Sequence, residues 1–392
     1  MMIERRLAQM KMARRNLLAA AAMATLAACA VVPKGPVAPP PPRPTPAPTT
    51  SELPTDTQHH RIALLVPMSG ANGAVGQSIA NAATMALMDT NAKNLRITNY
   101  DTSAGAGVAA SRAIADGNQL ILGPLLADDI PAVAAAARSA KVPLISFSND
   151  QSAAARDVYV MGSLPGSSVR RTVRYAREHG VTSFAALVPK GDYGERASQS
   201  LIAEARAAGG TIMAMESYDR STASITAAAT KLRARGAFDA ILIADSGGLS
   251  ARAAGLLKAR GSATPRLLGT ELWSGEKAIT TAPALNGAWF SAVSDSRFPQ
   301  FVSSYRTRFG AAPYRIATLG YDAVLLTLRV ARDWKPGRAF PTAALTSTDG
   351  FLGLDGAFRF NKDGVIDRAL EVREVSGGAV KVVSPAATKF GG

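Results

Sequence analysis

Short apolar segments alternate with helical segments along most of this chain, and this alternation limits the possible fold more than any other feature. The runs "IALLVP" (62–67), "LILGP" (120–124) and "VPLISFS" (142–148) are typical of buried strands, and segments with helical periodicity separate them. Strands and helices joined by short connections form parallel sheets with helices on both faces. The helix expected after the first run has one apolar stripe: Ile79, Ala82, Ala83, Ala86 and Leu87.

A second series of the same kind begins near residue 167. The helix expected at 167–180 turns Val169, Val173 and Ala176 inward, and its arginines Arg170, Arg174 and Arg177 form a basic face that could contribute to contacts or simply face solvent. Strands follow at "SFAALVP" (183–189) and "FDAILIAD" (238–245), each before another helical segment. About 330 residues after the first strand are enough for two lobes.

The sequence therefore predicts an α/β fold with two doubly wound, Rossmann-like lobes joined by crossover hinge segments. We assign 59–164 plus 295–338 to the first lobe, and 165–294 plus 339–386 to the second. In the last of these segments, the alternation and the Asp-Gly turns of "GLDGAFRFNKDG" predict hairpin strands.

The N-terminal 28 residues have the pattern of a secretory signal peptide. A basic front precedes the apolar run 16–28, and about 13 residues are too few to span a bilayer, which takes roughly 20. Leu26–Cys29 matches the lipobox of bacterial lipoproteins, which predicts cleavage before Cys29 and lipidation of that residue, although a cysteine could follow a signal peptide by chance. Ala30 then favours the outer membrane, and Arg14-Arg15 leaves the general and twin-arginine export routes open.

Residues 29–58 are predicted to form the lipid anchor and a tether rich in proline. A segment of 29 residues (30–58) in an extended polyproline conformation, at about 3.1 Å each, reaches up to roughly 90 Å. Loss of 1–28 removes five basic residues and one acidic residue, so the formal charge falls from +15 to +11. A basic exported chain favours anionic glycan, lipid headgroups or acidic partners, whereas export disfavours nucleic acid.

The segments in their order resemble periplasmic type I solute-binding proteins of the branched-chain amino acid receptor kind. The resemblance extends over residues 61 to about 380 and implies the type I periplasmic binding protein fold, with a ligand cleft between the lobes. The segments that carry it are 61–87, 120–148, 192–210, 319–326 and 353–364.

Within this superfamily the lipobox, the proline tether, "GPLL" (123–126) and "PKGDYG" (189–194) are most similar to penicillin-binding protein activators. That resemblance implies a non-catalytic, lipid-anchored periplasmic protein that activates or regulates peptidoglycan synthesis through a penicillin-binding protein or another cell-wall synthase. The alternative is the lipid-anchored substrate-binding component of an ABC-type importer for an amino acid or another small solute. The sequence names neither the synthase nor the solute, nor the oligomeric state.

Catalytic motifs are missing from the sequence. Of the three histidines, His59 and His60 lie at the end of the tether and His179 precedes a helix-ending glycine. The segment 245–248 ("DSGG") follows a strand as a nucleophile elbow does, but the first glycine of that motif is absent. The lone "GAG" at 105–107 is far from a dinucleotide fingerprint. We therefore expect no enzyme activity, no cofactor and no metal.

Loops at the carboxyl ends of the strands are the expected position of a ligand or partner cleft. Asp128 is expected to cap the helix that follows it and to repel an anionic ligand, at the place where amino-acid receptors hold a carboxylate. Tyr193 and Trp273 would supply an apolar wall. The predicted cleft residues are Ser69, Gly70, Asn72, Ala127, Asp128, Ser146, Ser148, Asn149, Asp192, Tyr193, Asp245, Trp273 and Tyr321.

Overall fold

A computed structural model describes residues 59–258 and 264–390, which belong to one compact unit, Leu53–Gly392. The predicted signal peptide (1–28), the lipidation at Cys29 and the tether lie outside the described residues. None of the helices in the described ranges is both long and apolar enough to cross a membrane.

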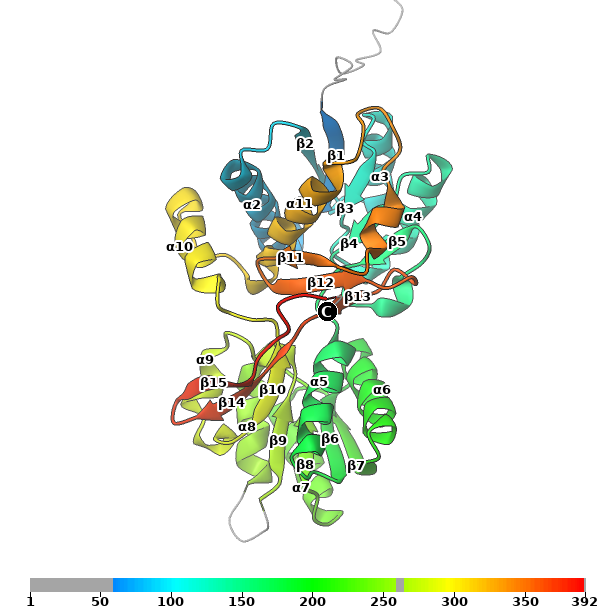
Figure 1. Cartoon of the computed structure of the whole chain (residues 1–392). Coiled ribbons are helices and arrows are strands. Elements are labelled where there is room, and N and C mark those ends of the chain that lie inside the picture. The colour runs from blue at the N-terminus through cyan, green and yellow to red at the C-terminus, as the bar shows by residue number, and fades with distance from the viewer. Residues whose placement is uncertain (1–58, 259–263, 391–392) are drawn as a thin grey trace, which may run out of the picture. The chain divides into compact units, whose positions relative to one another are not determined.

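The first lobe is built on a five-stranded parallel sheet with the strand order β2-β1-β3-β4-β5 (Figure 1). Strand β1 is central enough to pair with both β2 and β3, so the chain winds outward from it in two directions. The strands are β1 (His60–Val66), β2 (Leu95–Asp101), β3 (Leu120–Leu122), β4 (Leu144–Ser146) and β5 (Val158–Val160).

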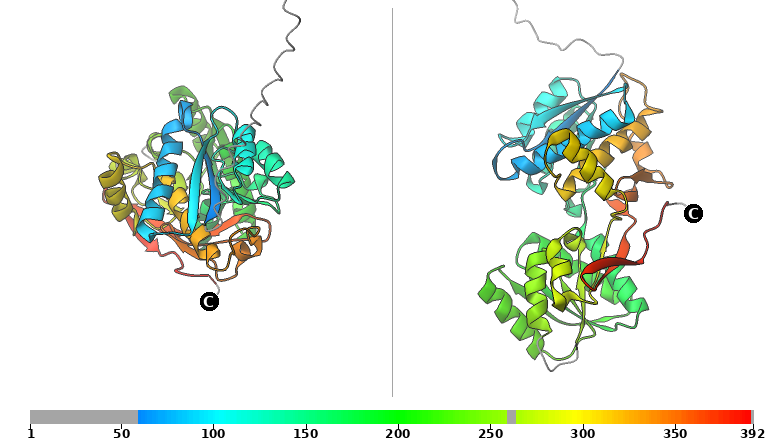
Figure 2. Two further views of the ribbon diagram at one scale, coloured as in Figure 1. Left: turned by 90° about the horizontal axis from the view of Figure 1, so that it is seen from above. Right: turned by 90° about the vertical axis from the view of Figure 1, so that its left-hand side faces the viewer.

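Alternate residues of β1 enter two separate cores, which explains why the whole strand is apolar. Ile62 and Leu64 pack in the core shared with α2 (Gly73–Thr90) and α11 (Thr318–Ala331). Ala63 and Leu65 pack in the core of α3 (Ala106–Ala115) and α4 (Ile130–Ser139). Helices therefore cover both faces of the sheet, as the left view of Figure 2 shows.

The second lobe is built on a seven-stranded sheet with the order β15-β14-β10-β9-β8-β6-β7. Its strand pairs are parallel except the two pairs that β14 makes, because β14 runs antiparallel to both β10 and β15. Alternate residues of β6 again divide between two cores, one with α5 and α6 and one with α7 and α8. The bounds of the strands are β6 (Ser183–Pro189), β7 (Thr211–Tyr218), β8 (Ala240–Ile243), β9 (Arg266–Gly269), β10 (Trp289–Ala292), β14 (Glu371–Ser376) and β15 (Ala379–Ser384).

The helices of the second lobe, and the helix that follows its β10, also have defined bounds. They are α5 (Pro165–Glu178), α6 (Asp192–Ala207), α7 (Thr222–Ala234), α8 (Gly247–Leu257), α9 (Lys277–Thr281) and α10 (Phe298–Phe309). Helix α10 packs on α2 of the first lobe through Phe301 and Tyr305. Both lobes are doubly wound, so the predicted α/β fold class is confirmed.

The lobe assignment of the segment after residue 338 differs from the expected one. A small antiparallel sheet of β11 (Phe351–Gly353), β12 (Gly356–Phe360) and β13 (Ile366–Arg368) packs its Phe358 and Phe360 into the core of the first lobe. Phe360 meets the Tyr159 ring edge-on at 5.3 Å between centroids. Only β14 and β15 join the sheet of the second lobe, because β14 pairs with β10.

Candidate functional site

A cavity of about 540 Å³ opens among the loops at the carboxyl ends of the strands. The first lobe contributes Asn72 after β1, Leu125 after β3 and Ser148 after β4, and the second contributes Glu271 after β9 and Val293 after β10. Loops at this edge of doubly wound sheets form the ligand sites of many α/β proteins. About half of the residues in the wall are apolar, and polar and charged side chains converge among them, as a site that orients a small molecule requires.

Hydroxyl groups fix the shape of the loop after β4. Ser146 is buried, and its Oγ donates to the carbonyl of Pro124 at 2.9 Å while it accepts from the backbone N–H of Ser148 at 3.1 Å. The Oγ of Ser148 then accepts from the N–H of Asp150 at 3.0 Å. The chain also passes very close to Gly162, where a Cβ atom would stand 2.1 Å from the carbonyl oxygen of Ser148. Ser148 and Asn149 are thereby held at the cavity wall.

Among the described residues, Glu271 is one of three charged groups of the wall with a buried atom that lacks a hydrogen-bond partner; the others are Arg315 and Arg368, each through its Nε. The Oε1 of Glu271 accepts from the hydroxyl of Tyr193 at 2.9 Å, and that hydroxyl also lies 2.9 Å from Oγ1 of Thr270. Its Oε2 is buried and has no hydrogen-bond partner in the part of the chain that the structure describes. Burial raises the pKa of Glu271 to about 7. A carboxyl group with a free oxygen can accept a hydrogen bond from a bound molecule. When it is ionised, it can also pair with a positive charge on that molecule.

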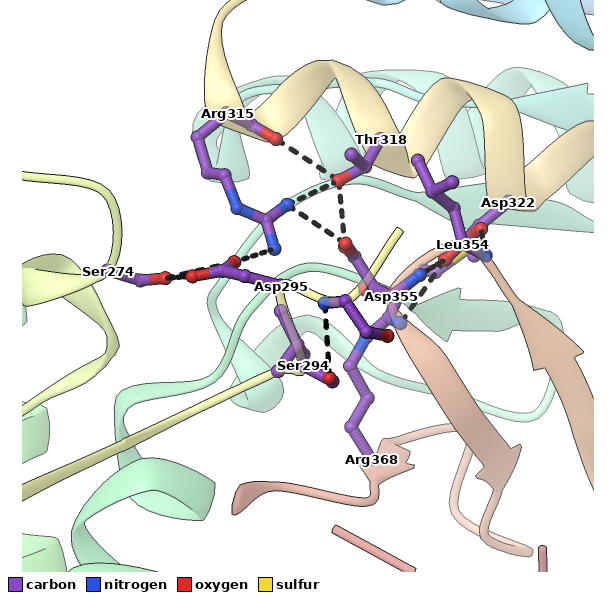
Figure 3. A network of polar contacts seen from close by, with 12 residues as sticks. Ser274, Ser294, Asp295, Arg315, Thr318, Asp322, Leu354, Asp355 and Arg368 are labelled. Carbon is purple, nitrogen blue, oxygen red and sulfur yellow. Dashed lines mark hydrogen bonds and ion pairs between the residues drawn. The ribbon is translucent and has the colours of Figure 1, made fainter. Parts of the chain in front are cut away.

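Arg315 crosses the floor of the cavity and connects segments that are distant in sequence (Figure 3). Its Nη1 donates to Asp355 Oδ1 at 2.9 Å and to Thr318 Oγ1 at 3.0 Å, and its Nη2 donates to Asp295 Oδ1 at 3.3 Å. Asp295 follows β10 and also pairs with Arg373 of β14. These ion pairs therefore join the start of α11, the turn between β11 and β12, and the second lobe.

Asp322 and Arg368 form a second buried ion pair beside this one, with Nη1 and Oδ2 3.5 Å apart. Asp322 also accepts from the backbone N–H groups of Leu354 and Asp355, and Figure 3 shows it on the same helix as Thr318. Burial, and secondarily the charge of Asp355, raises the pKa of Asp322 to about 7. Arg368 lines the cavity, and its side chain is only 4% exposed.

Four of the residues predicted for the cleft line this cavity: Asn72, Ala127, Ser148 and Asn149. Two more stand directly behind the wall, since Ser146 positions Ser148 and Tyr193 binds Glu271.

The other predicted residues lie outside the cavity. Asp245 is buried within the second lobe, where its Oδ2 accepts from the hydroxyl of Tyr218 at 2.8 Å and lies 3.1 Å from Nε of Arg220. Trp273 is a core residue whose Nε1 donates to Ser250 at 2.9 Å. Tyr321 donates to Asp89 at 3.1 Å on the outer side of α11. Exposed positions in loops or at helix starts are occupied by Ser69, Gly70, Asp128 and Asp192.

The capping role expected for Asp128 is wrong. Residues Ala127–Asp129 form a short 3-10 helix that leads into α4, and neither helix start has a side-chain cap hydrogen bond. Pro131 lies in the first turn of α4. Because proline has no backbone N–H group, this turn has one donor fewer that needs a cap. Burial and the neighbouring charge of Asp128 raise the pKa of Asp129. Asp128 itself stays exposed, so its charge is available to solvent or to a partner.

Sequence reasoning missed Glu271, Arg315, Thr318, Asp355 and Arg368. Glu271 could have been found, because it lies in the same post-strand loop as Trp273, which was chosen for its aromatic ring. The other four lie in segments far along the chain from the first strands of the cavity wall, and no local sequence pattern identifies them. No group of three His, Cys, Asp or Glu side chains suited to a metal ion occurs within 59–258 and 264–390.

Solved structures with this architecture include several solute-binding proteins. A putative branched-chain amino acid ABC transporter protein from Rhodospirillum rubrum has a TM-score of 0.74 and 23% identity, covering 83% of this chain and 100% of that one. LivJ from Streptococcus pneumoniae, solved with isoleucine, has a TM-score of 0.62 and 20% identity over 83% and 100%. A solute-binding protein from R. palustris, solved with benzoate, has a TM-score of 0.62 and 18% identity over 84% and 98%.

Sequence comparison adds a relative and a family. The protein RP748 of Rickettsia prowazekii (strain Madrid E) is 29% identical over 140 residues, which span 35% of this chain and 38% of that protein. The family described as periplasmic binding protein matches residues 60–379, nearly all of the described chain. The chain therefore belongs to the periplasmic binding protein family.

Proposed function

We propose that this chain is a non-catalytic binding protein of the cell envelope that takes a small solute into the cavity between its lobes. The observation that carries the proposal is the buried, unpartnered Oε2 of Glu271 in the wall, an acceptor atom in the same cavity as the unpartnered Nε atoms of Arg315 and Arg368. A polar atom left unsatisfied inside a protein costs stability, and a ligand group that donates to it recovers that loss.

The charges around the cavity favour a solute with a cationic or hydrogen-bond-donating end and an apolar body. Arg315 and Arg368 are already paired with Asp355 and Asp322, so their positive charges are largely compensated. Among the described residues, Glu271 has no such cation beside it, and the hydroxyls of Tyr193 and Ser168 are the groups that face it. A cationic donor would stabilise the ionised carboxyl, so we expect affinity to rise with pH through about 7.

Relatives with known ligands bind isoleucine or benzoate, two small molecules with apolar bodies. By analogy, this chain would serve as the substrate-binding component of an ABC-type importer. The periplasmic family agrees with the export predicted from residues 1–28, and we propose that lipid on Cys29 holds the chain at the outer membrane. The unpaired Glu271 favours an amine such as benzylamine over benzoate.

A second candidate is activation of peptidoglycan synthesis through contact with a penicillin-binding protein or another synthase. Ion pairs that tie the two lobes together favour it, because a protein that acts through its surface gains from a fixed lobe spacing. Arg196 of α6 lies 3.3 Å from Asp150 of the first lobe, and Asp295 bridges Arg315 to Arg373. The exposed Asp128 and the tether would then present the domain to its partner.

A thermal-shift screen with benzylamine, isoleucine and benzoate, run on wild type and Glu271→Gln, separates the two candidates. A solute at a hundred to a thousand times its dissociation constant stabilises the folded state by about 3 to 4 kcal/mol. We expect a shift with an amine that disappears in Glu271→Gln. No shift with any solute, together with capture of a synthase from envelope extract by the full chain, would reject the solute receptor and support the activator.

A further inference from the structure

A surface groove of about 770 Å³ on the first lobe combines positive charge with apolar side chains and lies outside the cavity. The end of α2, the outer side of α11 and the start of β11 form it, and no acidic residue lines it. Its cations are Lys93, Arg329 and Arg332, all exposed. Leu352 stands among them with 56% of its surface exposed, beside the half-buried Leu328.

The three cations have no acidic partner among the described residues. Lys335 and Arg338, in the exposed loop after α11, extend the basic surface and are likewise without an ion pair there, while Asp333 offsets one charge. We call the groove, together with the surface of the adjoining loop, the basic groove; its five cations are Lys93, Arg329, Arg332, Lys335 and Arg338.

Other arginines of the chain show the contrast. Arg170 lies 3.7 Å from Asp367, Arg174 lies 3.7 Å from Glu204, and Arg308, nearer the groove, pairs with Asp89 at 2.6 Å. The expected basic face of α5 is thus partly neutralised, whereas the basic groove keeps its charge available for an external anion.

The basic groove lies next to the start of β1, the first strand of the domain. The N–H of His60, at the start of β1, donates to the carbonyl of Asn94 at 2.8 Å, and Asn94 lines the groove. The ring of His60 stacks on Trp334 at 3.9 Å, which fixes the loop that carries Lys335. Figure 1 shows the starts of β1 and β2 and the ends of α2 and α11 at this end of the lobe. A chain held by lipid at its N-terminus would reach the domain on this side.

We propose that the basic groove binds the phosphate-bearing headgroups of an anionic lipid bilayer. Cations beside exposed leucines match the layered chemistry of a membrane surface, where phosphates lie above an apolar zone. An acidic protein segment would pair with the cations but would not bury the exposed apolar side chain of Leu352. The surface would hold the first lobe against the membrane and turn the second lobe away from it, independently of what the cavity binds.

Co-sedimentation with vesicles tests this proposal on the full chain with Cys29→Ser. Vesicles of phosphatidylcholine alone are compared with vesicles that also contain phosphatidylglycerol. The groove variant is Lys93→Glu/Arg329→Glu/Arg332→Glu, and the matched control is Arg206→Glu/Lys231→Glu/Arg233→Glu, which makes the same charge change at exposed positions of the second lobe. Both variants keep the N-terminal segment, so its contribution to binding cancels.

We expect phosphatidylglycerol-dependent binding of wild type and control, and a loss of about fivefold per cation in the groove variant. High salt should remove most of the difference, because the groove cations are exposed. Equal loss in both variants, or no loss in the groove variant, overturns the proposal. Binding to poly-glutamate but not to vesicles would assign the surface to an acidic protein partner and also overturn it.

A label gives a second measurement in case the triple variant does not fold. An environment-sensitive dye on Thr90→Cys, in the Cys29→Ser background, reports on the groove of an otherwise intact domain, since Thr90 is an exposed residue of the groove wall. Its emission should shift to the blue with phosphatidylglycerol vesicles and not with phosphatidylcholine vesicles. The same emission with both vesicles contradicts the proposal.

Discussion

Replacing Arg315 by Met should lower the free energy of unfolding by about 3 kcal/mol, and the reason lies in the unequal burial of its two acidic partners. The side chain of Asp355 is 5% exposed, so its charge would remain in the interior without a counterion. Breaking a buried pair in this way costs roughly 3 to 5 kcal/mol. Asp295 is 35% exposed and keeps Arg373, so its share of the loss is small.

Urea unfolding followed by circular dichroism measures this loss, and a double-mutant cycle assigns it. In Arg315→Met/Asp355→Asn the uncompensated charge is gone, while the amide oxygen can still accept from Thr318, which donates to Asp355 at 2.7 Å in the wild type. We expect the double variant to be more stable than the single variant by about 1 to 2 kcal/mol. Arg174→Met, in a pair whose arginine is 60% exposed, is the control and should change stability by less than about 0.5 kcal/mol. A similarly small loss in Arg315→Met, or additive losses in the cycle, would contradict the expected role of Arg315 as the counterion of a buried charge.

Three further predictions concern other parts of the fold. The folded state raises the pKa of Glu271 from 4.5 to about 7, so wild-type stability should fall as pH rises through this window, and denaturation curves should show a smaller fall for Glu271→Gln. Gly194→Ala would place a Cβ atom 1.7 Å from the carbonyl oxygen of Pro189, so it should destabilise the second lobe by more than 1 kcal/mol, measured as a lower urea midpoint. Phe358→Ala should cost about 3 to 5 kcal/mol and speed amide exchange in β1 before β6, whereas faster exchange in β6 first would place this residue in the other lobe.

The sequence was sufficient to predict the two sheets and their helices, because strand and helix periodicity are local properties. Val169, Val173 and Ala176, for example, are buried on α5 as expected. The lobe to which β12 belongs is not local information. It depends on where Phe360 finds an aromatic partner, and that partner, Tyr159, lies about 200 residues earlier in the chain.

The candidate site was predictable only where a residue lies in the loop that follows a strand. Asn72 and Ser148 met that condition, and both line the cavity. Trp273 met it as well, but its ring packs over Gly269, where a Cβ atom would stand 2.3 Å away, so it belongs to the core. Arg315 and Arg368 reach the cavity through tertiary packing, which the hydrophobic periodicity of helices and strands cannot predict.

In the proposed solute site, the free carboxylate oxygen of Glu271 receives the polar end of a small solute. Titration calorimetry with benzylamine, on wild type and Glu271→Gln, at pH values below and above the pKa of about 7, tests it most directly. We expect the wild-type affinity to rise across this pH range. We expect the affinity of the variant to be at least tenfold lower than that of the wild type at the higher pH, in line with the loss of about 1.5 to 3 kcal/mol for a charged hydrogen bond. Equal affinity in the two proteins, or no binding of amines by the wild type, would contradict it.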